Sequence, residues 1–190
     1  MHMFQDQDCM PNGIGKLYKF LDIPDHLQIS NDLLDYYNSI TKFKEVRGFT
    51  KVVDTVPLLC NLPQLHHTFK RLQLNCVYTA FVVVHSSQPE IVHKDHGTHR
   101  YRLLWPVQNC QNTFVRFFNV GEDKKIWVDG PTNKYHQYDI TGATEIENYE
   151  LTSPIVADVT IPHYIDVKHL NGVRISFYCM FDNDPVHLIE

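Results

Sequence analysis

The stretch Cys76-Val-Tyr-Thr-Ala-Phe-Val-Val-Val-His85 decides the fold class, because most of its residues are β-branched or aromatic. Residues of these types favour the pleated, half-buried surface of a strand. Four shorter runs of the same kind follow at residues 101–107, 113–120, 155–161 and 173–181. Many strands with no helical pattern between them predict a mainly β fold, an antiparallel sandwich or barrel.

The first 75 residues carry a different pattern, and we expect them to support the β structure. Apolar residues recur at helical spacing over residues 24–40 and 57–74, and Pro63 is positioned to break the second helix. These helices are predicted to pack on one outer face of the strands. Near the other end of the chain, Asn171-Gly172 separates two apolar runs and predicts a hairpin, because both residues tolerate positive φ.

A chain of 190 residues has the usual size of one domain, which buries roughly 70% of its unfolded surface. We therefore expect residues 1–190 to form a single domain with its β core over residues 76–182. Residues 121–150 are polar and separate two of the predicted strands, so they are expected to form an insert or lid.

The composition argues against several classes of function. A formal charge of −5, from 17 Lys+Arg against 22 Asp+Glu, leaves no positive excess to bind nucleic acid. No apolar run reaches the roughly 18 to 20 residues of a membrane span, and the N-terminus lacks a signal pattern. A soluble, cytoplasmic protein is expected. The five cysteines form no Cys-x-x-Cys pair, which argues against a disulfide framework or a zinc site and favours reduced, mostly buried thiols.

Five residues form the candidate site: His93, Asp95, His163, Arg174 and Ser176. Two imidazoles and one carboxylate are the ligands of a facial triad that holds non-haem Fe(II) and leaves its other side open. Because side chains at i and i+2 of a strand share a face, Arg174 and Ser176 are expected to point together into one cavity. There they would bind an acidic co-substrate.

Each part of this pattern is common by itself. About one His-x-Asp triplet is expected by chance in a chain with this many histidines and aspartates. The whole set, with a second histidine upstream of an Arg-x-Ser in the right order, should occur by chance in on the order of one chain in twenty. The joint pattern therefore predicts a metal site.

Longer stretches around these residues carry a family resemblance. They are Ile91-Val-His93-Lys-Asp95, the run from Arg102 to Thr113, the run from Pro154 to His163, and Arg174-Ile-Ser-Phe. Together they resemble the Fe(II)/2-oxoglutarate-dependent oxygenases, most closely the compact microbial and phage-type members. The similarity covers about residues 76–182.

The resemblance implies a double-stranded β-helix, the jelly-roll or cupin-like barrel. It implies that His93, Asp95 and His163 bind Fe(II), and that Arg174 and Ser176 bind the distal carboxylate of 2-oxoglutarate. Such enzymes use O2 to convert the keto acid to succinate and carbon dioxide while they hydroxylate a substrate, here an amino acid, a peptide or a small metabolite.

Other polar residues have simpler interpretations. His96, His99, His136 and His169 are rival ligands that fit the spacing less well. Arg102 and Arg116 lie on predicted strands and are expected to face solvent, with a second anion anchor as the alternative. Asn109 and Thr113 are expected to make turn hydrogen bonds. Tyr78 is expected to be an ordinary buried tyrosine, or else a donor to the co-substrate.

Two further functions remain open. One is a cupin-like metal enzyme without a keto-acid co-substrate, which the absence of any Glu between Ile91 and Gly121 disfavours. The other is a non-catalytic jelly-roll module, because a fold does not fix a function.

Overall fold

The computed structural model describes residues 16–41, 50–87, 91–95, 99–129 and 134–190. The helices are α1 (His26–Ile40), α2 (Thr55–Asn61), α3 (Pro63–Arg71), the short C-terminal α4 (Val186–Ile189) and the 3-10 turn η1 (Glu122–Lys124). The strands are β1 (Tyr18–Phe20), β2 (Thr50–Val53), β3 (Cys76–His85), β4 (Tyr101–Gln108), β5 (Phe114–Asn119), β6 (Lys125–Asp129), β7 (Lys134–Tyr138), β8 (Thr144–Glu150), β9 (Ile155–Asp158), β10 (His163–Asp166) and β11 (Val173–Phe181).

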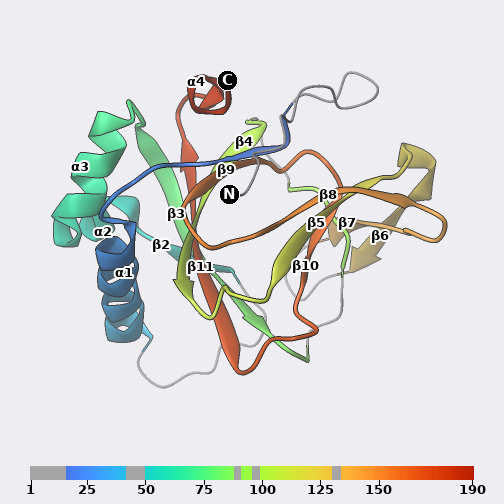
Figure 1. Ribbon diagram of the computed structural model, residues 1–190, viewed down its shortest axis with the longest axis horizontal. Helices are drawn as coiled ribbons and strands as arrows, with labels where there is room; N and C mark the ends of the chain where they lie inside the picture. The colour runs from blue at the N-terminus through green and yellow to red at the C-terminus, as the bar shows by residue number, and fades with distance from the viewer. Residues whose placement is uncertain (1–15, 42–49, 88–90, 96–98, 130–133) are drawn as a thin grey trace, which may run out of the picture.

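The described strands form antiparallel sheets. Six strands pair in the order β1-β9-β4-β11-β3-β2, three pair in the order β10-β5-β8, and β6 pairs with β7. The protein is therefore mainly β with few helices, as the β-branched runs predict. In Figure 1 the six-stranded sheet stands between α1, α2 and α3 on the left and β5, β8 and β10 on the right.

The N-terminal helices pack against the outer face of the six-stranded sheet. Ile29 and Leu33 of α1 are buried in a core cluster that also contains residues of β3, β4 and β11. The side chain of Ser30 anchors the helix, because its hydroxyl donates to the Pro106 carbonyl at 2.6 Å and accepts from Trp105 Nε1 at 3.1 Å. The helices thus cover one side of the sheet and leave its other side to the site.

Strand β11 shows how alternation separates core from site. Ile175, Phe177 and Cys179 lie in the core beneath the helices, whereas Ser176 and Tyr178 line a cavity on the opposite face. Successive side chains of a strand point to opposite faces, so one strand serves both purposes. Arg174 Nη1 donates to Ser176 Oγ, so these two side chains share a face as predicted. Ser176 lines the cavity, whereas the fully buried Arg174 is not among the lining residues.

The structure differs from the sequence prediction in several elements. Strands β1 and β2 add edges to the sheet from the N-terminal region, which was expected to be helical or irregular. Strand β8 lies inside the expected insert at 121–150, yet it pairs along its length with β5. Pro63 does divide the second helical stretch, since it is the first residue of α3.

The hairpin predicted at Asn171-Gly172 is wrong. Strands β10 and β11 flank this dipeptide, but they lie in different sheets and do not pair. Gly172 has φ +93°, whereas Asn171 does not have positive φ, so only one of the two residues adopts the conformation that the predicted hairpin turn needs. The turn carries the chain from one sheet to the other instead of folding it back beside itself.

Candidate metal centre

Two segments far apart in the chain meet at the candidate ligands. His163 begins β10, and His93 lies opposite it in an isolated antiparallel bridge. The two residues exchange both backbone hydrogen bonds, each at 2.9 Å. The Asp95 amide donates to the Val159 carbonyl at 3.0 Å, which fixes the residue two positions after His93. Main-chain bonds therefore hold all three ligand residues in register.

The side chains of these three residues converge. One potential ligand atom from each of His93, Asp95 and His163 lies within 4.8 Å of the other two. His93 Nε2 is 3.5 Å from Asp95 Oδ1, and the two imidazole centroids are 4.8 Å apart. Within the described residues this is the one group of three or more His, Cys, Asp or Glu side chains close enough to share an ion.

Both imidazoles are oriented as metal ligands usually are. His93 Nδ1 lies 2.9 Å from the Ile91 carbonyl, and His163 Nδ1 lies 2.8 Å from the Ile161 carbonyl. A carbonyl oxygen only accepts, so each Nδ1 must carry the proton. In the neutral form of each ring, Nε2 then has the free lone pair, which is the usual outer-shell arrangement of a ligating histidine.

The electrostatics favour an ionised Asp95 carboxylate and a neutral His163 imidazole. Burial alone would raise the pKa of the Asp95 carboxyl, but the hydrogen bond with His93 and the nearby His163 and Arg102 hold it below its ordinary value. Burial, followed by repulsion from His93, lowers the pKa of His163. Burial also disfavours the charged form of His93, yet its bond to Asp95 leaves its pKa raised. A cation between these groups would take the place of that His93–Asp95 contact.

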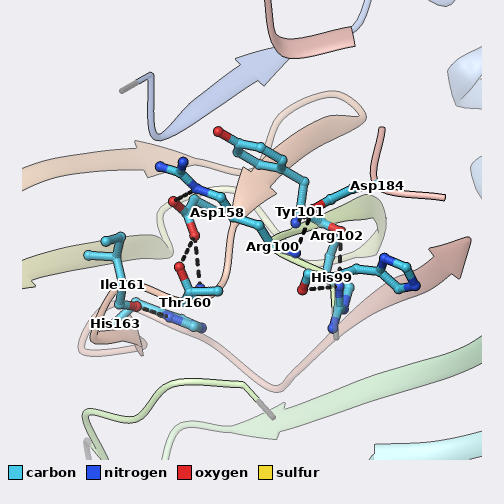
Figure 2. Close-up of polar contacts among 9 residues, drawn as sticks. All are labelled: His99, Arg100, Tyr101, Arg102, Asp158, Thr160, Ile161, His163 and Asp184. Atoms are coloured by element: carbon cyan, nitrogen blue, oxygen red, sulfur yellow. Dashed lines mark hydrogen bonds and ion pairs between the residues drawn. The ribbon is translucent and has the colours of Figure 1, made fainter. Parts of the chain in front are cut away.

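A network around Asp158 shapes the turn between the ligands (Figure 2). The fully buried Asp158 carboxylate accepts from Arg100 Nε at 2.6 Å, from the Thr160 amide at 2.9 Å and from the Thr160 hydroxyl at 2.6 Å. The turn it organises presents the Val159 carbonyl to Asp95 and the Ile161 carbonyl to His163. Sequence reasoning missed this network, because nothing in the local pattern links Arg100 to Asp158.

The segment after Gly121 contacts residues 91–95, the segment that carries His93 and Asp95. Lys94, between the two ligands, forms an ion pair with Glu122 of η1, and this contact lowers the pKa of the Glu122 carboxyl to about 2. The Tyr138 hydroxyl also donates to Glu122 at 3.1 Å, and the Tyr138 amide donates to the Val92 carbonyl at 2.9 Å. Part of the predicted insert therefore supports the ligand segment.

Arg174 is fully buried and only partly paired. Its Nε donates to Thr113 Oγ1 at 3.1 Å and its Nη1 donates to Ser176 Oγ at 3.0 Å. Its Nη2 has no hydrogen-bond partner. The Thr113 hydroxyl donates in turn to the Cys110 carbonyl at 2.7 Å, so the predicted turn bond of Thr113 exists and also orients Arg174.

A cavity of about 650 Å³ joins these groups. It is lined by residues of both sheets, so the sheets face each other across it. His93, Asp95, His163 and Ser176 are among its lining residues. Leu104, Val115, Phe117 and Ile165 give it apolar walls.

The other polar residues that the sequence singled out lie both inside and outside the cavity. Arg102 was expected to face solvent, and that is wrong: it is fully buried, because its strand position puts it on the cavity side of β4. Arg116 is partly exposed and pairs with Glu145 and Asp166, outside the cavity. Tyr78 lines the cavity.

The rival histidines do not join the cluster where the structure describes them. His169 is exposed, and His99 is half-buried and outside the group. His96 and the side chain of His136 lie outside the described residues.

The cysteines are free where the structure describes them. Cys110 and Cys179 are buried and Cys60 is exposed, while Cys9 lies outside the described residues.

The sequence matches no protein-family model, and no curated protein is significantly similar to it. The candidate site therefore rests on its own geometry. No helix within the described ranges is both long enough and apolar enough to cross a membrane.

Proposed function

We propose that the protein is an Fe(II)- and 2-oxoglutarate-dependent dioxygenase that hydroxylates an amino acid, a peptide or a small metabolite. One observation carries the proposal: the ligand atoms of His93, Asp95 and His163 lie within 4.8 Å of one another in a cavity whose wall includes Ser176, the partner of the buried Arg174.

The path of the chain between its sheets supports a double-stranded β-helix. Strands β3, β4, β9 and β11 lie in the six-stranded sheet, and β5, β8 and β10 lie in the smaller one, which His93 joins through its bridge to His163. The chain changes from one of these sheets to the other between β4 and β5, and again at each of the three connections from β8 to β11. Jelly rolls, which are built from two sheets and Greek-key connections, have this kind of path.

The donor set fits ferrous iron. Two neutral imidazoles and one carboxylate on one side of an ion form the facial triad of non-haem Fe(II) oxygenases, which leaves positions for a chelating co-substrate and for O2. The three residues would hold the ion from two antiparallel segments that hydrogen-bond each other. A structural zinc site would close its coordination with a fourth protein ligand, and the described residues offer none here.

The unpaired Arg174 Nη2 fits a carboxylate. A buried guanidinium N–H with no acceptor carries a desolvation penalty of about 1 to 3 kcal/mol, which a carboxylate oxygen would remove. The planar fork of arginine binds carboxylates through parallel hydrogen bonds, and the Ser176 hydroxyl beside it offers a further donor. A cupin-like enzyme without a keto acid would leave this arginine unexplained.

The residues of the chain would then divide the work. When bound, iron and 2-oxoglutarate supply the O2-dependent conversion of the keto acid to succinate and carbon dioxide, with hydroxylation of a C–H bond. His93, Asp95 and His163 hold the metal, and Arg174 with Ser176 fixes the far end of the keto acid. The apolar side chains of Leu104, Val115 and Phe117 limit water in the cavity, while the substrate enters beside them.

The test is binding and turnover with the full-length protein. Anaerobic Fe(II), or Mn(II) as a stable substitute, should raise the melting temperature together with 2-oxoglutarate, and the Asp95→Ala variant should lose this response. Arg174→Gln should keep the metal response and lose the 2-oxoglutarate response. Asp35→Ala, at an exposed position of α1, is the matched control.

Turnover gives the second measurement. Iron-loaded protein should release succinate from 2-oxoglutarate under air, and His163→Ala should abolish this release while His169→Ala, at an exposed position, should not. Protein that binds no stoichiometric metal at these three residues would refute the proposal and favour a non-catalytic module. Metal binding without any effect of 2-oxoglutarate would favour a cupin-like enzyme.

A further inference from the structure

Arg102 is a second buried arginine with an unsatisfied donor. It lies on β4, and its Nε donates to the Tyr178 hydroxyl at 3.2 Å. Its Nη1 donates to the carbonyls of His99 at 2.6 Å and Tyr101 at 3.0 Å. Its Nη2 is buried with no hydrogen-bond partner. Figure 2 shows Arg102 and His163 extending to the same side of the Arg100–Asp158 ion pair.

The two buried arginines are built alike. Each is fully buried, each donates to one hydroxyl that lines the cavity, and each keeps one NH2 group unpaired. The lining hydroxyl is Ser176 Oγ for Arg174 and the Tyr178 hydroxyl for Arg102. If Arg174 and Ser176 bind an anion, Arg102 and Tyr178 offer the same kinds of donor to another anion.

The two arrangements reach the cavity through different residues. Ser176 and Tyr178 are successive lining positions of β11, about 7 Å apart along an extended strand. The Arg102 arrangement belongs to the same cavity as Asp95, because Tyr178, which accepts from Arg102 Nε, lines that cavity together with Asp95. One 2-oxoglutarate molecule chelated to the metal and bound to Arg174 would leave Arg102 unneutralised.

Tyr178 adds a donor to the Arg102 end. Burial raises the pKa of Tyr178 to about 12, so its hydroxyl stays protonated. The oxygen accepts from Arg102 Nε, and the hydroxyl proton remains for an occupant of the cavity. Its ring packs edge-on against Tyr78, another lining residue, with centroids 6.0 Å apart, which fixes the position of the hydroxyl.

A purely structural role explains only part of this arrangement. Bonds from Nη1 to the His99 and Tyr101 carbonyls tie down the chain before β4, but they do not require the second NH2 group. The net charge of the loaded site also favours a bound anion. A ferrous ion and two arginines carry four positive charges, whereas Asp95 and dianionic 2-oxoglutarate carry three negative charges, which leaves one positive charge. A single carboxylate on the substrate would balance it.

We propose that Arg102 and the Tyr178 hydroxyl bind a carboxylate of the substrate, which is therefore a carboxylate-bearing small molecule such as a free amino acid. The turnover of that molecule rests on the proposed function, whereas its binding does not.

The test is ligand binding to full-length, Mn(II)-loaded protein, with and without 2-oxoglutarate. The probes are pairs that differ by one charge: L-aspartate and L-asparagine, L-glutamate and L-glutamine, L-leucine and L-leucinamide, glycine and glycinamide. The first two pairs test a side-chain carboxylate, and the last two test an α-carboxylate. Calorimetry or the shift in melting temperature reports the dissociation constant.

We expect at least one carboxylate probe to bind about ten- to a hundredfold more weakly to Arg102→Gln, the range for hydrogen bonds to charged groups. The partner probe, in which that carboxylate is replaced by an amide, should bind wild type and Arg102→Gln equally. Tyr178→Phe, which keeps the ring and removes only the hydroxyl, should weaken the same probe about threefold to tenfold and serves if Arg102→Gln does not fold. Arg116→Gln, the matched control on β5, should bind it as wild type does.

Equal binding of the carboxylate probes to wild type, Arg102→Gln and Tyr178→Phe, or no binding to wild type, would overturn the inference. So would binding that Arg174→Gln abolishes and Arg102→Gln leaves intact, because then only one anion site exists. If 2-oxoglutarate fails to bind while a probe still depends on Arg102, the proposed function fails and the carboxylate site stands.

Discussion

Removing the Asp158 carboxylate should displace the candidate metal ligands Asp95 and His163, although Asp158 contacts neither of their side chains. Asp158→Ala deletes three accepted hydrogen bonds, one from Arg100 and two from Thr160. The turn they hold carries the Val159 and Ile161 carbonyls, which fix Asp95 and His163. Loss of a direct outer-shell partner, such as the Ile161 carbonyl, costs about ten- to a hundredfold in metal affinity. Because Asp158 acts through the turn that carries this carbonyl, we expect a loss near the lower end, about tenfold, for Mn(II) or Fe(II).

Stability should fall as well. A charge-assisted bond contributes about 1.5 to 3 kcal/mol, and an amide left without an acceptor costs about 1 to 3 kcal/mol. Because the Arg100 side chain is 43% exposed and its bond is partly screened, we expect a total loss near 2 to 4 kcal/mol in the free energy of unfolding. Urea unfolding measures it, and titration against a chelator measures the metal affinity.

The control must lower stability without moving the ligands. Asp166→Ala serves, because Asp166 lies on the same strand as His163 but pairs with Arg116 outside the cavity. It should destabilise the protein and leave the metal dissociation constant within about twofold. Equal metal affinity in Asp158→Ala and wild type, or an equal loss in Asp166→Ala, would refute the positioning role of Asp158.

Three further outcomes are expected. Thr113→Val leaves Arg174 Nε without its acceptor, so 2-oxoglutarate should bind about tenfold more weakly in calorimetry. Burial alone would raise the pKa of the Asp166 carboxyl, but the Lys168 amide and Arg116 hold it below its ordinary value of 3.8. The ionised carboxylate therefore stabilises the fold fully above pH 3.8, and this stabilisation is lost as the pH falls through the lower pKa of the folded state. Asp166→Asn should reduce this loss, measured as the free energy of unfolding in urea at a series of acidic pH values. Phe177→Ala, at a fully buried position, should cost about 3 to 5 kcal/mol in the free energy of unfolding.

Sequence patterns predicted the central strands because their chemistry is local. Strand β3 is a ten-residue run of β-branched and aromatic residues, and its observed bounds are those of the predicted run. Strands β1 and β2 have three and four residues, too few for any periodicity to separate them from loops. The Asn171-Gly172 turn shows the same limit, since φ preference identifies a turn but not the sheet that receives the next strand.

The candidate ligands followed from residue type and order, but their supports did not. His93, Asp95 and His163 have side chains that metals prefer, so the sequence could single them out. Asp158, Thr113 and Arg102 act through contacts 58 to 76 residues away in the chain, at Arg100, Arg174 and Tyr178. No local spacing encodes such contacts. Arg102 was misread because a charged residue on a strand usually faces water, and only the three-dimensional structure shows the side it occupies.

The mutual backbone bonds between His93 and His163 have a consequence for metal choice. Main-chain pairing sets the geometry before any ion arrives, so apoprotein and loaded protein should share one conformation, and loading should involve little refolding. A preformed trio of nitrogen and oxygen donors ranks divalent ions by their intrinsic affinity, with copper and zinc ahead of iron. Occupancy of the proposed site by iron would then depend on which ions are available in the cell, and zinc would act as a competitive inhibitor of iron binding.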